Sequence, residues 1–213
     1  MNHNLEHILV IGPTGAGKTS QGRALAGMSN RPYADMSRIL KISGKFHPEV
    51  ANRALQYSAN GLLVPDEIIM PEFDTYLSTH NHGTKMVFMG VPRISTQVEP
   101  FLESVERHIG FTHFVVADLD LSPETAIRRC KERAERAKAK GETPRHEDLD
   151  EKIIRKRLDD WMQEKQSLLN ALDGNARLVR IECQEDPQAT FLSLVKGVGM
   201  ENELFIEPAP LKG

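Results

Sequence analysis

The stretch Gly12–Thr19 reads Gly-Pro-Thr-Gly-Ala-Gly-Lys-Thr and decides the fold, because it fits the phosphate-binding pattern G-x-x-x-x-G-K-[ST]. The apolar run Ile8–Ile11 before it predicts a buried parallel strand, and Ser20–Ala26 after it predicts a helix. Glycines at such a turn let the backbone approach a ligand, and the amide groups there form a nest for an anion. The pattern therefore predicts a P-loop that binds nucleotide phosphates.

The positions of this loop have separate predicted roles. Lys18 adds a point charge for the outer phosphates, and the Thr19 hydroxyl can bind Mg²⁺. The candidates for holding donor phosphates through the loop and the helix start are Gly12, Thr14, Gly15, Ala16, Gly17, Lys18, Thr19 and Ser20. The alternative is a glycine-rich turn that binds nothing, which the flanking strand and helix disfavour.

The composition is that of one soluble domain. The chain has 213 residues, of which 39% are hydrophobic and 27% charged. Its net charge of −3 gives no general attraction to nucleic acid or anionic membrane, so an anion needs a local cluster of basic residues. The two cysteines make no disulfide framework and predict free thiols in a cytoplasmic protein. The N-terminus lacks a basic region, and we expect neither a signal peptide nor a membrane span.

Strands and helices alternate along the chain, which predicts a parallel α/β sheet sandwiched by helices. Further strands are expected at 33–34, 86–89, 114–120 and 178–182, and further helices at 36–42, 49–60, from 66, 96–108, 123–140, 150–172 and 187–198. Pro71 lies inside the helix that starts near Asp66 and should kink or restart it. The apolar stripe that includes Trp161 is expected in the core.

Arginines stand where strands end and near helix starts. Arg93 follows a predicted strand through Gly90, and ligands of open α/β sheets bind beyond the carboxyl ends of the strands. A guanidinium there can clamp a phosphate, and the amide of Gln97 suits a base edge. For any single arginine, a solvated surface charge is the alternative. Several of them in a P-loop fold favour a phosphate site, and the others are Arg129, Arg133, Arg145 and Arg157.

Together these pieces resemble nucleoside monophosphate kinases of the adenylate kinase family. The matching stretches, in family order from about residue 7 to 195, are 11–18 with Gln21, 61–67, 90–93 with Gln97, 119–121 with Arg129 and Arg133, and 151–158. The resemblance implies a P-loop core at 1–34, 65–133 and 150–200. It also implies an acceptor-binding helical insertion at about 35–64 and a short lid at about 134–149. The prolines and the terminal glycine of the segment 201–213 predict a loose tail.

For the donor, the resemblance implies ATP with Mg²⁺. Lys18 and the loop amides would hold the donor phosphates, and Arg129 would stack on or flank the donor base. Arg133 and Arg145 would reach the donor phosphates from the lid. Phosphoryl transfer depends on positioning and charge neutralisation, for which such cations are suited. Lid closure would exclude water that could hydrolyse the donor.

For the acceptor, the resemblance implies a nucleoside monophosphate, with AMP as the first candidate. Arg93 and Arg157 would grip its phosphate and Gln97 its base, while Val64 and Gly90 would line its site. The resemblance implies no nucleic acid and no membrane as partner, and we expect a monomer.

Departures from the family pattern concern the metal and the acceptor. Met89 stands where the family has an aspartate that orients water around the metal, and Asp118 and Asp120 on another strand are the candidates to compensate. In the acceptor segment, Lys41 replaces an arginine and keeps the charge without the bidentate fork, and Arg38 is an added cation. The short lid has no cysteine set for zinc, and Arg145 fits its family position only with one residue inserted.

Other functions stay open. Met89 and the altered acceptor segment motivate a catalytically weak, nucleotide-binding regulatory relative, and a P-loop kinase for a sugar or an acid is a further alternative. A GTPase switch is disfavoured, because neither Asn-Lys-x-Asp nor Asp-x-x-Gly is present. The basic run 128–140 has interleaved glutamates and no aromatics, which favours a solvated helix over a nucleic-acid patch. His80 and His82 resemble a metal pair, but a polar loop is the better interpretation.

Overall fold

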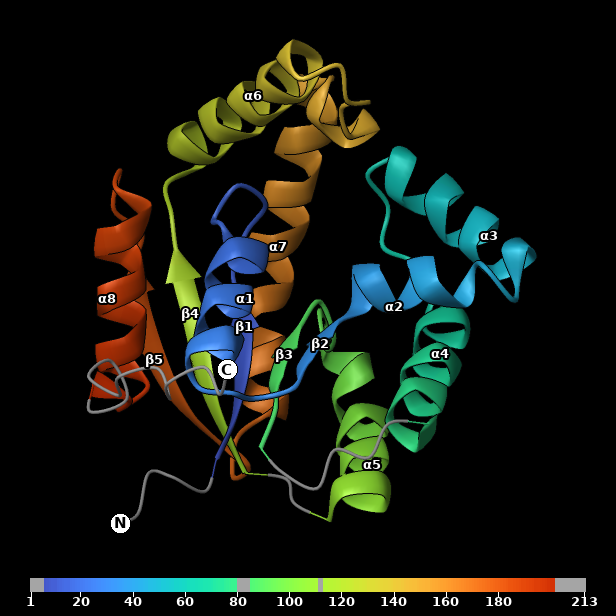
Figure 1. Ribbon diagram of the computed structural model, residues 1–213, viewed down its shortest axis with the longest axis vertical. Coiled ribbons are helices and arrows are strands. Elements are labelled where there is room, and N and C mark those ends of the chain that lie inside the picture. The colour runs from blue at the N-terminus through green and yellow to red at the C-terminus, as the bar shows by residue number, and fades with distance from the viewer. Residues whose placement is uncertain (1–5, 80–84, 111–112, 202–213) are drawn as a thin grey trace, which may run out of the picture.

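The sheet is five-stranded and entirely parallel, in the order β2-β3-β1-β4-β5. The computed structural model in Figure 1 describes residues 6–79, 85–110 and 113–201. The strands are β1 His7–Ile11, β2 Tyr33–Asp35, β3 Val87–Met89, β4 Phe114–Asp120 and β5 Ala176–Glu182. All five residues of the central strand β1 are buried, as expected of an apolar run between two parallel neighbours. The predicted fold class is confirmed.

Helices cover both faces of the sheet. They are α1 Lys18–Met28, α2 Met36–Ser43, α3 Pro48–Ala59, α4 Asp66–Thr79, α5 Val98–Ile109, α6 Pro123–Ala139, α7 Glu151–Ala171 and α8 Pro187–Gly197. Short 3₁₀ turns lie at η2 Ser95–Gln97 and η3 His146–Asp148. Helices α1 and α8 pack on one face, and α4, α5 and α7 on the other (Figure 1).

An aromatic cluster fixes the α4–α5 side of the sheet. Phe73 of α4 stacks on Phe101 of α5 with 5.3 Å between ring centroids. Phe88 of β3 meets Phe101 edge-on at 5.3 Å, and Phe114 of β4 lies 5.9 Å from Phe88. Aromatic pairs of this kind contribute about 0.5–1.5 kcal/mol each beyond the area they bury. The cluster therefore holds α4 and α5 rigidly against the strands whose ends carry the candidate site.

Two parts of the chain extend past the carboxyl edge of the sheet. Helices α2 and α3 lie on one side of Figure 1, and α6 with the start of α7 lies across its top. A small apolar cluster joins α6 to α7, and its buried residues are Ala126, Ile127, Cys130, Ile154 and Leu158. Ser122 caps α6 by accepting from Thr125 N at 3.3 Å, and Pro123 is the first helical residue, as predicted.

Some local predictions need correction. Pro71 lies within one continuous helix, α4, so the predicted restart there is wrong. Its ring is exposed, while Ile69, Phe73 and Leu77 on the other side are buried, so core packing carries the helix through the missing hydrogen bond. The helix expected at 96–108 begins as the 3₁₀ turn η2 and becomes α5 at Val98. The polar loop expected at His80–His82 and the tail at 202–213 lie outside the described residues.

Among the helices of the described ranges, none combines the length and the apolar character needed to cross a membrane.

Candidate functional site

The P-loop joins β1 to α1 at the carboxyl edge of the sheet. Gly12, Gly15 and Gly17 have φ angles of 142°, 80° and 82°, a region that favours glycine. A Cβ on Gly12 would lie 2.6 Å from the carbonyl oxygen of Leu119, and a Cβ on Gly15 would lie 2.8 Å from that of Ala126. The loop therefore needs glycine at both places, where it passes against the end of β4 and the start of α6.

The first turn of α1 has the geometry of an anion-binding site. Its N-cap is Gly17, and no side chain caps the helix. The first amide groups of a helix have no intrahelical acceptor, and the helix dipole adds partial positive charge at that end. Amide groups of the loop and of Ala16–Ser20 are thus in the arrangement that binds phosphate in other proteins.

Thr19 is the loop residue that fits a metal ion. It is half-buried in the first turn of α1, and its hydroxyl is a hard oxygen ligand. The described residues contain no group of three or more His, Cys, Asp or Glu side chains that could hold a metal ion. Mg²⁺ in phosphate sites keeps several waters and is shared with the substrate's phosphates. A single hydroxyl therefore fits a Mg²⁺ that arrives with a nucleotide, where the ion would neutralise phosphate charge.

Lys18 lies folded over the loop. Its Nζ donates to the carbonyl oxygens of Gly12 at 2.8 Å and Pro13 at 2.6 Å. Burial lowers the pKa of Lys18 from 10.5 to about 7, and the positive charges of Arg93, Arg157 and Arg133 act in the same direction. The site therefore has an excess of positive potential that a polyanion would relieve.

This pKa predicts proton uptake on nucleotide binding. At pH 8 the Lys18 amine is mostly neutral, because the pH lies above its pKa of about 7. Bound phosphates favour the charged form and raise this pKa, so ATP binding at pH 8 should take up most of one proton. Calorimetry in buffers of different ionisation enthalpy measures the uptake, and Lys18→Met should remove it. ATP binding with no proton uptake at pH 8 would contradict the assignment.

A cavity opens beside the P-loop and joins four parts of the chain. Its walls come from Gly12–Thr14 with Lys18, from 61–64, from 90–94 and from α7. Arg93, Arg157, Val64 and Gly90, the four residues predicted for the acceptor phosphate and its surroundings, all line it. Burial lowers the pKa of Arg93 to about 10, and the charge of Arg157 lowers it next, although Asp35 and Glu147 oppose the shift. The structure thus brings Lys18, Arg93 and Arg157 to one cavity.

The face of α7 in this cavity extends beyond Arg157. Asp160, Trp161 and Glu164 also line the cavity, at helical spacing from Arg157. Trp161 packs against the core, as expected, but is half-buried and faces the cavity as well. Counting three, four and seven residues onward from Arg157 would have found all three residues in the sequence.

Arg133 and Arg157 each have a carboxylate partner. Arg133 forms two hydrogen bonds to Asp148, each 2.6 Å long, and Asp148 is buried. Burial lowers the pKa of Arg133, but its hydrogen bonds and ion pair with Asp148 outweigh this and raise it. Arg157 lies 3.2 Å from Glu147 of η3. Arg145 is exposed at the start of η3, and its charge contributes to lowering the pKa of Arg93.

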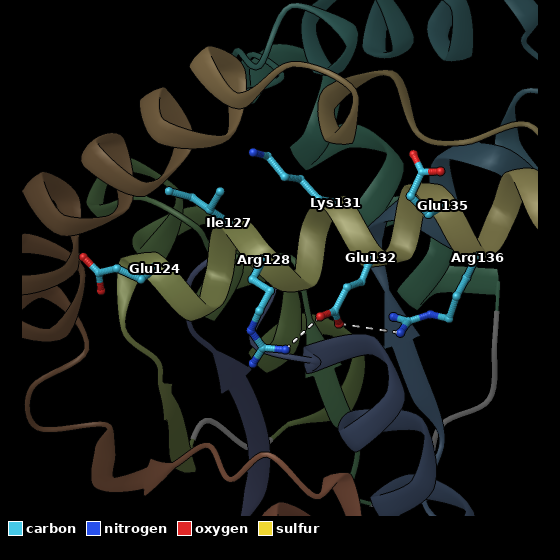
Figure 2. A pocket seen from close by; sticks show the side chains of 7 residues that line it. All are labelled: Glu124, Ile127, Arg128, Lys131, Glu132, Glu135 and Arg136. Carbon is cyan, nitrogen blue, oxygen red and sulfur yellow. Dashed lines mark hydrogen bonds and ion pairs between the residues drawn. The ribbon is translucent and has the colours of Figure 1, made fainter.

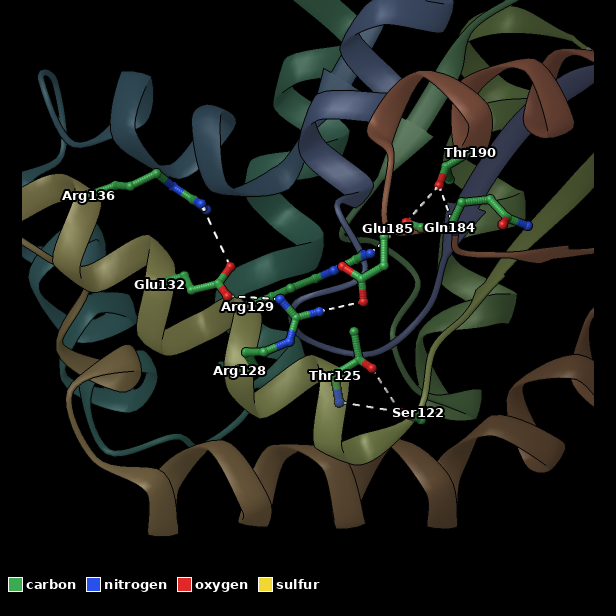
Figure 3. Close-up of polar contacts among 9 residues, drawn as sticks. All are labelled: Ser122, Thr125, Arg128, Arg129, Glu132, Arg136, Gln184, Glu185 and Thr190. Carbon is green, nitrogen blue, oxygen red and sulfur yellow. Dashed lines mark hydrogen bonds and ion pairs between the residues drawn. The ribbon is translucent and has the colours of Figure 1, made fainter.

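Arg129 lies away from the cavity, at the loop that follows β5. Its Nη2 donates to the carbonyl oxygen of Gln184 at 2.6 Å (Figure 3). Thr190 holds the same loop by accepting from Gln184 N at 2.9 Å. Next to Gln184, the Cys183 thiol lies 3.6 Å from the carbonyl oxygen of Ala16 in the P-loop. Arg129 therefore belongs to the outer side of the P-loop, opposite the side where Arg93 and Arg157 lie.

The predicted acceptor contacts divide into two groups. Val64, Gly90, Arg93 and Arg157 meet at the cavity, whereas Arg38 and Lys41 are exposed on α2 and do not line it.

Gln97 is buried, and its amide is already engaged. Its Oε1 accepts from Arg93 N at 2.8 Å, and its Nε2 donates to Asp66 at 2.7 Å. In this arrangement Gln97 braces the backbone that carries Arg93, and one amide hydrogen remains for a base.

A separate hollow lies on the outer face of α6, as Figure 2 shows. It is lined by Glu124, Ile127, Arg128, Lys131, Glu132, Glu135 and Arg136. Glu132 pairs with Arg128 at 2.8 Å and with Arg136 at 3.8 Å, so opposite charges alternate along this face. Such a surface is a solvated helix face, and it contains none of the predicted site residues.

Known proteins of similar sequence have one description in common. The chain is 27% identical to an adenylate kinase of Caldicellulosiruptor bescii, in an alignment that covers 91% of this chain and 99% of that protein. It is 26% identical to an adenylate kinase of a Synechococcus strain, with 91% and 97% of the two chains covered. A match of 26% identity to the Deinococcus deserti adenylate kinase covers 90% and 95%. No protein-family model matches the chain.

The fold and the loop define a P-loop α/β protein, with a parallel sheet sandwiched by helices. The full-length similarities make the chain a divergent, adenylate kinase-like protein.

Proposed function

We propose that the protein transfers the γ-phosphoryl group of ATP to a nucleoside monophosphate, with AMP as the first candidate. The observation that carries this proposal is the cavity where Lys18, Arg93 and Arg157 meet beside the P-loop. Two phosphate chains brought end to end repel each other, and converging cations in a partly buried site offset that repulsion. The names of the similar proteins support the same reaction class.

In this mechanism the residues act by position and charge. The P-loop amides and Lys18 hold the donor phosphates, and Mg²⁺ carried by ATP supplies further charge neutralisation near Thr19. Arg93, in the segment that follows β3, and Arg157 of α7 hold the acceptor phosphate. Arg133, fixed by Asp148, and Arg145 approach the donor from the lid. The insertion at 35–64 and the lid at 134–149 are proposed to enclose the two substrates, which would exclude water during transfer.

A panel assay tests the proposal. The protein is incubated with ATP, Mg²⁺ and each of AMP, CMP, UMP, GMP and their deoxy forms, and the nucleotides are separated by chromatography. We expect a diphosphate product from at least one acceptor. ATP binding without any such product would instead support the second candidate, a nucleotide-binding regulatory relative, which the buried Met89 at the end of β3 favours.

Arg93→Ala should separate the acceptor from the donor. Without its charge-assisted hydrogen bonds to the acceptor phosphate, the KM for the monophosphate should rise on the order of 100-fold, while ATP affinity stays within a few-fold. Steady-state kinetics with ATP and monophosphate varied in turn measure both effects. Arg128→Ala on the outer face of α6 is the matched control and should behave as wild type. Equal loss for both substrates would contradict the assigned role of Arg93.

A further inference from the structure

The carboxylate of Asp66 joins two walls of the cavity. Asp66 is the first residue of α4 and follows the cavity segment 61–64 after one proline. Its Oδ1 accepts from Gln97 Nε2 at 2.7 Å, and its Oδ2 accepts from Thr96 Oγ1 at 2.7 Å. Both donors belong to η2, which comes after the cavity segment 90–94. Each oxygen of Asp66 therefore has a partner, and the carboxylate is fixed in place.

These contacts determine which way the Gln97 amide lies. A carboxylate can only accept a hydrogen bond and a backbone N–H can only donate one, whereas a side-chain amide does both. Asp66 therefore requires the amino group of Gln97 on its side, and Arg93 N, 2.8 Å from Oε1, requires the oxygen on the other side. Because Gln97 is 2% exposed, a reversed amide would leave buried polar groups without partners. The two partners thus demand the same orientation.

An amide held in one orientation recognises one order of donor and acceptor. After the two contacts, Gln97 has one N–H and one lone pair of its oxygen left. Adenine and cytosine present an amino group beside a ring nitrogen that accepts, whereas hypoxanthine, guanine and uracil present an oxygen beside a ring N–H. An amide that could turn over would fit both kinds of base. An amide that cannot turn over fits one kind and places donor against donor with the other.

We propose that Asp66 determines the class of base that the acceptor site takes, by fixing the orientation of Gln97, and that this class is the amino bases adenine and cytosine. The inference rests on the proposed function, in which AMP is the first candidate acceptor. The Gln97 amide is buried against the backbone of Arg93, so a base would reach it from the cavity that Arg93 lines. Asp66 is not among the described residues that line this cavity, so it is a positioning residue that acts through Gln97.

The pair AMP and IMP tests this, because the two differ in this base edge and have nearly the same size. The value of kcat/KM for each acceptor is measured with ATP and Mg²⁺, for the wild type and for Asp66→Ala. We expect the wild type to prefer AMP. Asp66→Ala should reduce the ratio of the AMP value to the IMP value by about tenfold, since one charge-assisted hydrogen bond no longer opposes the reversed amide. A merely structural role would lower both values equally.

Glu67→Ala is the matched control. Glu67 is the other acidic residue in the first turn of α4 and is exposed, so its removal takes the same charge from the helix start. It should keep the wild-type ratio. Circular dichroism checks the fold of each variant. If Asp66→Ala does not fold, Asp66→Asn is measured in its place and should also lower the ratio, because its amide can offer Gln97 either an oxygen or an amino group.

The outcomes separate this inference from the proposed function. If the best acceptor is a pyrimidine, CMP and UMP form the matched pair. A wild-type ratio in the folded Asp66 variant, an equal loss for both acceptors, or a wild type that uses the keto base as well as the amino base overturns the inference and leaves the proposed function standing. No diphosphate from any monophosphate with the wild type overturns the proposed function, and the inference with it.

Discussion

Lys18→Ala should abolish phosphoryl transfer and leave the fold intact. Lys18 is the charged group of the P-loop, and loss of one group that stabilises the transferring phosphates lowers kcat on the order of 100- to 1,000-fold. Within the folded protein, the substitution removes only the two hydrogen bonds that Nζ donates to loop carbonyls. A coupled assay for ADP formation measures the activity, and circular dichroism with urea unfolding measures the fold.

The free energy of unfolding of Lys18→Ala should depend on pH less steeply than that of the wild type. The native pKa of Lys18 is about 7, below its ordinary value of 10.5. Between these values the unfolded chain binds more protons than the folded one, so stability rises with pH in the wild type, and this slope should be smaller in Lys18→Ala. Lys196→Ala, exposed at the end of α8, is the control. Near-normal transfer by Lys18→Ala would mean that the P-loop assignment is wrong.

Lys165→Met should have the largest effect on stability. Lys165 Nζ lies 2.6 Å from Asp118 Oδ2, although off the hydrogen-bond direction, and Asp118 is fully buried. Arg180, whose Nε is 3.9 Å from the same oxygen, is mostly exposed. Removing one partner of a buried pair leaves an uncompensated charge, so we expect a loss of about 3–5 kcal/mol in the free energy of unfolding. Urea unfolding at pH 7 measures it.

Two controls isolate the cause. Asp118→Asn combined with Lys165→Met removes both charges and should recover most of the lost stability. Lys156→Met breaks the exposed pair between Lys156 and Asp160 on the same helix, and it should cost less than about 1 kcal/mol. Equal losses for Lys165→Met and Lys156→Met would show that the Asp118 pair has no special importance.

The fold could be predicted largely from local patterns. The buried run Ile8–Ile11 and the glycines after it determine a strand, a turn and a helix within a short stretch of chain, and these came out as expected. The effect of Pro71 could not be predicted, because the packing of α4 on β3 and α5 outweighs the local preference of proline. Long-range packing, which a single sequence does not show, decides such cases.

The candidate site was predictable where motifs carry it. The P-loop, Arg93 and Arg157 were expected together and lie together at the cavity. Gln97 was expected to read a base, but its partner Asp66 is 31 positions away and engages its amide. The roles of Arg38 and Lys41 stay predictions.

Transfer of label from γ-labelled ATP tests the central claim most directly, since it follows the phosphoryl group itself. The protein is incubated with Mg²⁺, γ-labelled ATP and AMP, or with the best acceptor of the panel, and the products are separated. We predict label in the β-phosphate of the new diphosphate, with little inorganic phosphate. Label found only in inorganic phosphate, or kept in ATP with every monophosphate, would contradict the account.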